Sequence, residues 1–188
     1  MSMNKTTFVS PDFTPQGTLY IVSANKEQNH SLEFEHFRKM LGDAFALQGY
    51  TIVNSMKKAK QIAIVSYGMD NGHTKTVSTP IYGYDDFNRY SILIPGYPMP
   101  NYAIVGMNTV EYEEYTHVLA IEIVEASTIK SKHIKQLYSA KVVTKNSCPM
   151  ITPVFNDLVA GFFTQFPGSN AQAMQFKVQS NMRCSQYQ

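Results

Sequence analysis

The stretch that decides the fold is SLEFEHFRKMLGDAFALQG, residues 31–49. Its apolar side chains recur at helical spacing, at Phe34, Phe37, Leu41, Ala44 and Phe45. Ser31 suits the N-cap, because its hydroxyl can accept a hydrogen bond from the first turn, and Gly49 suits the C-terminal stop, because it tolerates a positive φ. We therefore expect an amphipathic helix between Ser31 and Gly49.

Short runs rich in β-branched and aromatic residues lie on both sides of this helix, and each run predicts a strand. The Asn71-Gly72 turn favours a hairpin whose second arm is 74–78. The other expected strands are 18–24, 50–53, 61–67, 102–115, 116–126 (after a break near Glu113), 136–145 and an edge strand at 174–178.

A second helix is expected with Thr152 as its N-cap and Pro153 at its first position, ending at Pro167-Gly168. The order is then β-α-β-β-loop-β-β-β-α. Each element has one apolar side to bury, so we expect an α+β fold, a mainly antiparallel β-sheet with two helices packed on one face. The length fits a single domain, 1–188, with 1–16 as a flexible N-terminal linker and 80–102 as a Tyr/Pro-rich loop.

The composition narrows the classes of partner. Charged residues make up 16% of the chain, against about 25% on average, and the net charge is +2. Because the basic residues are scattered, we expect no nucleic-acid partner. No apolar run approaches the roughly 18 residues of a membrane helix. The N-terminus lacks an apolar signal core, which fits either a cytosolic protein or a mature form whose leader was removed.

Catalytic signatures are missing from the sequence. It contains no Gly-x-Ser-x-Gly elbow, no glycine-rich phosphate loop and no His-Glu-x-x-His motif. We therefore expect no catalytic residues, no cofactor and no enzymatic activity. The best metal candidate is Glu111, Glu113 and His117, because alternate residues of a strand share one face. The interpretation we favour is an exposed strand end with solvated acids, and so no metal.

The segment 80–102 is the best functional candidate. Tyrosine offers a large contact area and loses little conformational entropy on binding. The residues predicted to contact a partner are Tyr82, Tyr84, Tyr90, Tyr97 and Tyr102. The alternative is that these tyrosines pack the loop onto its own sheet.

The two cysteines, Cys148 and Cys184, could close one disulfide in an oxidising compartment. They could equally be two unrelated thiols, because free cysteine is commonly buried as a small apolar residue.

Several segments, taken in order, are similar to a group of uncharacterised bacterial envelope lipoproteins built around a domain of unknown function. The resemblance covers about residues 18–170. It rests on five segments: SLEF at 31–34 with the helix to Gly49-Tyr50, AIVSYGMD at 63–70, TPIYG at 79–83, LAIEIVEA at 119–126 and FFTQFPG at 162–168.

The resemblance implies a secretory leader and a lipid-carrying N-terminal cysteine, which this sequence lacks, and a place on the periplasmic side of the outer membrane. It carries no established activity. We expect a non-enzymatic domain that binds or supports another envelope component, with the membrane contacted only through a lipid anchor in the full-length protein. The alternatives are a carrier of a small apolar ligand held between helices and sheet, and a metal-dependent hydrolase.

Overall fold

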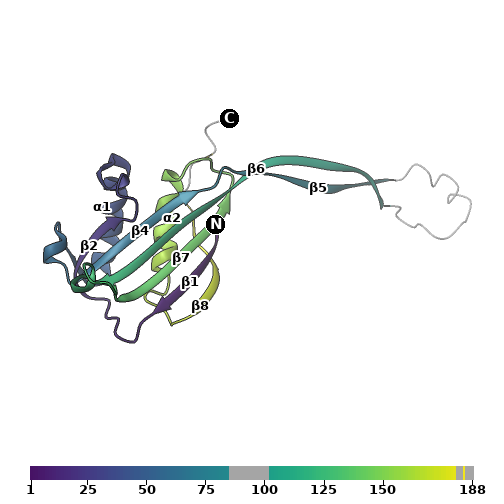
Figure 1. Ribbon diagram of the computed structural model, residues 1–188. Helices are drawn as coiled ribbons and strands as arrows, with labels where there is room; N and C mark the ends of the chain where they lie inside the picture. Colours follow the sequence, from purple (N-terminus) through teal and green to yellow (C-terminus); the bar gives the residue numbers. More distant parts are fainter. Residues whose placement is uncertain (85–101, 181–183, 185–188) are drawn as a thin grey trace, which may run out of the picture. The chain divides into compact units, whose positions relative to one another are not determined.

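A computed structural model describes residues 1–84, 102–180 and 184 of the chain (Figure 1). By their contacts, the residues divide into two compact units. The larger unit combines Met1–Gly72 with Tyr115–Gln188, and the smaller unit is His73–Glu114. One strand, β6, contributes residues to both units.

The described residues form mainly β-strands, with two α-helices among them in the chain order. In chain order they are β1 (Ser2–Val9), β2 (Gly17–Ser23), α1 (Leu32–Leu47), β3 (Tyr50–Ile52), β4 (Gln61–Met69), β5 (His73–Tyr84), β6 (Tyr102–Glu125), β7 (Gln136–Asn146), α2 (Thr152–Phe163) and β8 (Gln172–Lys177). Single turns of 3-10 helix occupy residues 28–30, 56–58 and 126–128.

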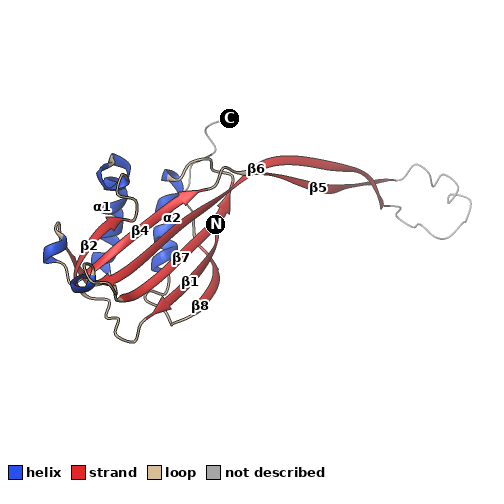
Figure 2. Cartoon of the chain, in the orientation of Figure 1, coloured by secondary structure: helices blue, strands red, loops and turns tan. Residues whose placement is uncertain are grey.

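The strands of the larger unit form a sheet in the order β3-β2-β4-β6-β7-β1-β8, and β5 pairs with β6. Strand β2 runs parallel to β3 and to β4, and the other pairs are antiparallel. Both helices belong to this unit (Figure 2). The expected α+β class, with a mainly antiparallel sheet and two helices, is confirmed.

The core lies between the helices and one face of this sheet. Alternate residues of the central strands enter it, such as Leu119, Ile121 and Ile123 of β6. Phe37 of α1 stacks on Phe155 of α2 with ring centroids 3.7 Å apart, which joins the two helices above the sheet. Burial of these aromatic and aliphatic side chains is the main stabilising contribution to this unit.

The predicted ends of the first helix are confirmed. The Ser31 hydroxyl accepts a hydrogen bond from the Phe34 amide at 3.0 Å, and Gly49 has a φ of +100°. The second helix differs at its start. Its N-cap is Ile151, without a side-chain hydrogen bond, and Thr152 is already helical. The predicted N-cap at Thr152 is therefore wrong by one residue.

The prediction of a flexible linker over 1–16 is wrong for residues 2–9, which form β1 between β7 and β8. Lys5 points into the core and its ammonium donates hydrogen bonds to the carbonyls of Phe162 and Thr164, the latter at 2.8 Å. These are free carbonyls at the end of α2, where a cation also complements the helix dipole. Burial lowers the pKa of Lys5 to about 8.

The predicted break near Glu113 is also wrong, because β6 is one strand of 24 residues. Instead, the strands that pair with β6 change close to Glu113. Residues up to Glu114 pair with β5, whereas Tyr115 onward pairs with β7 and His117 onward also with β4. Of the expected loop 80–102, residues 80–84 belong to β5 and Tyr102 begins β6, and 85–101 lie outside the described residues.

Candidate binding surface on the β5–β6 ribbon

The smaller unit is a two-stranded antiparallel ribbon, which we define as residues 73–84 paired with 102–114. Val77 lies opposite Val110, and the register continues on both sides without interruption as far as a shift between Ile81 and Tyr82. Residues directly opposite each other share a face of the ribbon, and the faces alternate along each strand. The register therefore assigns every described side chain of the ribbon to one of two faces.

One face, the apolar face, is defined by four large side chains that are about half exposed: Val77 (47%), Ile81 (48%), Val110 (52%) and Tyr112 (41%). Thr79 and Asn108 lie between them as a directly opposed pair. Lys75 and Glu114 lie on the same face and form an ion pair at 3.8 Å. This face therefore presents Val77, Val110 and Tyr112 as one apolar group, with Ile81 beyond the Thr79–Asn108 pair and the ion pair at the other end.

The other face, the polar face, carries mainly hydroxyl and carboxylate groups. The Thr74 hydroxyl donates to Glu113 Oε1 at 2.7 Å, and the hydroxyls of Ser78 and Thr109 lie 3.2 Å apart. Glu111 is on this face, opposite Thr76, and is exposed. The exposed Met107 is the exception, because it is a large apolar residue on the polar face.

The structure places the predicted tyrosines only in part. Tyr82 and Tyr84 belong to β5, where Tyr82 pairs with Ile104 and Tyr84 pairs with Tyr102 at the start of β6. Tyr90 and Tyr97 lie outside the described residues. The backbone of the ribbon thus brings Tyr84 and Tyr102, 18 positions apart in the sequence, opposite each other.

Sequence reasoning missed the apolar face next to these tyrosines. The alternation of Val77 with Thr76 and Ser78, and of Val110 with Thr109 and Glu111, was the available signal. It predicts a two-sided ribbon once the register between the strands is known.

The residues of the metal hypothesis have separate environments. Glu113 accepts the hydrogen bond from Thr74, and Glu111 is exposed on the ribbon. His117 is fully buried in the larger unit, where its Nδ1 lies 3.3 Å from the Asn146 amide nitrogen. Burial lowers the pKa of His117 below its ordinary value. Among the described residues, no group of three or more His, Cys, Asp or Glu is arranged to hold a metal ion.

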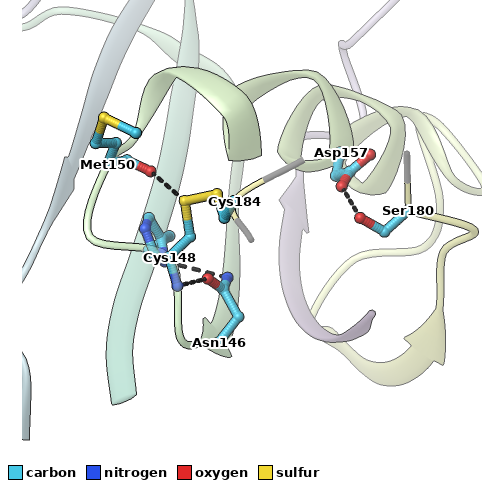
Figure 3. Close-up of a disulfide and its surroundings, with 7 residues drawn as sticks. Asn146, Cys148, Met150, Asp157, Ser180 and Cys184 are labelled. Carbon is cyan, nitrogen blue, oxygen red and sulfur yellow. Dashed lines mark hydrogen bonds between the residues drawn. A yellow bond between two sulfur atoms is a disulfide. The ribbon is translucent and has the colours of Figure 1, made fainter. Parts of the chain in front are cut away.

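A disulfide joins Cys148, which follows β7, to Cys184 near the C-terminus, with Cα atoms 5.5 Å apart (Figure 3). The backbone N–H of Cys148 donates to the Asn146 side chain at 2.8 Å. Nearby, the Ser180 hydroxyl donates to the buried carboxylate of Asp157 on α2. These two links attach the C-terminal segment to α2 and to the chain that precedes it.

The phenylalanines on the faces of the two helices, which are the sequence feature behind the ligand-carrier alternative, are core residues. Phe34, Phe37, Phe45, Phe155 and Phe162 are all fully buried and contact other aromatic rings. A groove of about 690 Å³ lies elsewhere, between α1 and the β2–β3 edge, and its walls include Arg38, Lys39 and Asp43. The sequence signal for a ligand carrier is therefore explained by packing of the core.

The fold defines a class, an α+β domain with two helices and a mainly antiparallel sheet, and solved structures share it. A PDZ domain protein from Parabacteroides distasonis matches 93% of this chain with a TM-score of 0.53 and 12% identity. The chain spans 38% of the length of that protein. At this identity the likeness shows the fold alone.

Two further solved structures are less similar. A DUF4136 family protein from Bacteroides thetaiotaomicron has a TM-score of 0.48 and 12% identity, with 89% of this chain and 97% of that chain covered. A PelC dodecamer from Paraburkholderia phytofirmans has a TM-score of 0.41 and 9% identity, with 89% and 99% covered. No protein-family model matches the chain, and neither does any curated protein. Within the described residues, none of the helices has the length and apolar character needed to span a membrane.

Proposed function

We propose that this chain is a non-enzymatic binding module of the bacterial cell envelope that contacts another envelope component through the β5–β6 ribbon. The observation that carries the proposal is the apolar face, where Val77, Ile81, Val110 and Tyr112 are each about half exposed. The predicted contact of Tyr82, Tyr84, Tyr90, Tyr97 and Tyr102 with the partner is part of the same proposal.

The physical reason is that a two-stranded ribbon is marginally stable in water when it has nothing to pack against. Its apolar side chains gain free energy only when a further layer or strand covers them. Val77, Val110 and Tyr112 adjoin one another on this face, and grouped apolar surface of this kind commonly marks a site of protein association. A partner that covers the apolar face would therefore stabilise the ribbon and be bound by it.

The envelope assignment has separate support. Disulfides persist in oxidising compartments such as the bacterial periplasm, and the Cys148–Cys184 bridge fits that setting. The proposal includes a lipid anchor at the N-terminus of the full-length protein and a location on the periplasmic side of the outer membrane. These two points rest on the resemblance of the sequence to envelope lipoproteins.

Site-specific photocrosslinking in the bacterium that encodes the protein tests the contact surface. A photoreactive phenylalanine analogue would replace Val77 or Val110 on the apolar face, with Thr76 on the polar face of β5 as the control. We expect discrete crosslinked products from the two apolar-face positions and at least several-fold less from Thr76. Equal yields from both faces, or no product from either, would contradict the proposal.

Metabolic lipid labelling and fractionation of the full-length gene product test the compartment. We expect a lipid-labelled product in the outer-membrane fraction that is shielded from protease in intact cells. A soluble, unlabelled cytosolic product would reject the envelope assignment. It would leave the crosslinking result to decide independently whether the ribbon binds a partner.

A further inference from the structure

The two halves of β6 differ in how many strands they pair with. From His117 to Val124 the strand pairs with β4 and with β7, whereas residues 106–114 pair with β5 alone. Within the described part of the chain, no strand pairs with the second edge of residues 106–114. An unpaired edge presents a row of backbone N–H and C=O groups, which is a template for another strand.

The two edges of the ribbon are not equally protected against strand addition. Strand β5 has Lys75 and Pro80, both of which discourage pairing at an edge. Residues 106–114 of β6, GMNTVEYEE, contain neither lysine nor proline, and their register with β5 is regular. The β6 edge is therefore the one open to a guest strand.

The charges along this edge are complementary to a basic guest. Residues 106–114 include Glu111, Glu113 and Glu114 and no basic residue. Glu114 is paired with Lys75, whereas Glu111 is exposed on the polar face, on the same side as Glu113, which accepts a hydrogen bond from the Thr74 hydroxyl. Side chains of opposite charge on adjacent strands stabilise their pairing.

A guest strand continues both faces of the ribbon, so each face dictates alternate residues of the guest. Beside Val110 and Tyr112 an apolar or β-branched side chain would be favoured, and beside Glu111 and Glu113 a lysine or arginine would be favoured. We propose that the β6 edge, residues 106–114, binds an extended segment of a partner protein in which apolar and basic residues alternate, by strand addition. This inference rests on the proposed function and specifies its partner.

Strand addition gives affinity through main-chain hydrogen bonds and specificity through alternate side chains. The probe for this site is a fluorescently labelled octapeptide of alternating valine and lysine, and binding to the intact protein is followed by fluorescence anisotropy. We expect the alternating peptide to bind at least about tenfold more tightly than a peptide of the same composition in blocks, or one with glutamate in place of lysine.

N-methylation separates strand addition from a simple charge contact. Methyl groups on the alternate amides that face the ribbon remove donors and block the approach, whereas methyl groups on the other amides leave those hydrogen bonds intact. We expect the affinity to fall about tenfold or more when the amides that face the ribbon are methylated, and to stay within about twofold when the other amides are methylated. Equal effects of the two patterns would overturn strand addition.

A matched pair of charge variants on the same strand tests the site itself. Glu111→Gln with Glu113→Gln should lower affinity several-fold and weaken its salt dependence. Glu122→Gln should have no effect, because Glu122 is an exposed acid of the half of β6 that is paired on both sides. An equal loss of affinity in the double variant and in Glu122→Gln would show a general electrostatic attraction and would overturn the proposed site.

The proposed function and this inference fail differently. If none of the peptides binds while Val77 and Val110 still crosslink to a partner in cells, the ribbon is a binding surface but its β6 edge does not accept a basic strand. If crosslinking also fails, the proposed function fails with it.

Discussion

The two halves of β6 belong to one strand and have opposite environments. Leu119, Ile121 and Ile123 of one half are fully buried, whereas Val110 and Tyr112 of the other half are about half exposed. Residues 109–113 alternate polar and apolar side chains, whereas residues 118–121 are apolar without interruption. The difference comes from the neighbours, because one half is covered by helices and the other is paired with β5 alone. Alternation thus predicts a two-sided strand without saying whether its apolar side is covered.

Truncation of a ring should separate the two environments most strongly. Phe37→Ala removes a fully buried ring stacked on Phe155, so we expect a loss of about 3–5 kcal/mol in the free energy of unfolding. Tyr112→Ala on the ribbon should change it by less than about 0.5 kcal/mol. Urea denaturation followed by circular dichroism measures both, and a loss at Tyr112 as large as at Phe37 would mean that the ribbon is packed in solution.

The disulfide should stabilise the larger unit alone. Replacing both Cys148 and Cys184 with serine removes a link between positions 36 residues apart. The unfolded chain then has more conformational entropy, so we expect a loss of about 2–4 kcal/mol in the free energy of unfolding. Hydrogen exchange should rise around the C-terminal segment and α2, with the β5–β6 ribbon unchanged. A double variant as stable as the parent protein would show that the bridge has no role in stability.

Because Lys5 is buried, we expect the free energy of unfolding to depend on pH. Between about pH 8 and 9.5 the folded chain releases the Lys5 proton, because the folded pKa is about 8, while the unfolded chain, with a pKa of 10.5, retains it. The unfolded state then binds more protons, so the free energy of unfolding should rise with pH, by at most about 1.4 kcal/mol per unit.

Lys5→Met is the control for this pH effect, because it keeps an unbranched apolar stem and removes the titrating ammonium. Its stability should be flat over the same interval. Measurements should stop below pH 10, because burial raises the pKa of Tyr67 from 10.0 to about 12. Above pH 10 a tyrosine of this kind loses its proton in the unfolded chain but keeps it in the folded one, which lowers the free energy of unfolding. A slope that persists in Lys5→Met would assign the effect to another group.

The smallest expected effect on stability is that of Val110→Thr on the ribbon. The side chain keeps its shape, and half of it is exposed, so the free energy of unfolding should change by less than about 0.5 kcal/mol. The same substitution at the fully buried Val142 of β7 should lower it by about 1–3 kcal/mol, because the hydroxyl would be buried. Thermal unfolding of the two variants side by side measures this contrast.

Local signals were sufficient for much of the larger unit. The spacing of Phe34, Phe37 and Leu41, with a cap on one side and a glycine on the other, predicts α1 because these interactions lie within one element. β1 was missed for the opposite reason. Its buried residues Met3, Lys5 and Thr7 include two polar ones, and their burial depends on α2 and on strands more than 130 positions away.

The candidate site was predictable only in part. The tyrosines from Tyr82 to Tyr102 indicate the region, because aromatic residues are frequent at contact surfaces. The apolar face needs the pairing of Val77 with Val110, and register between strands is a tertiary property that neither sequence run contains. To predict the open edge of β6, one must know where its pairing with β7 ends. That end is set by the register, at the pair Tyr115 and Asn146.

The position of β1 has a consequence for the folding of the chain. Met3 pairs with Thr144 and Phe176, so β1 precedes both of its partner strands by well over a hundred residues. Until β7 and β8 are present, the β1 backbone has no ladder to join, and the Lys5 ammonium has no helix end to bind. The sheet can therefore close only when both of these distant segments are available, and a fragment that ends before β7 should leave residues 2–9 open to proteases and chaperones.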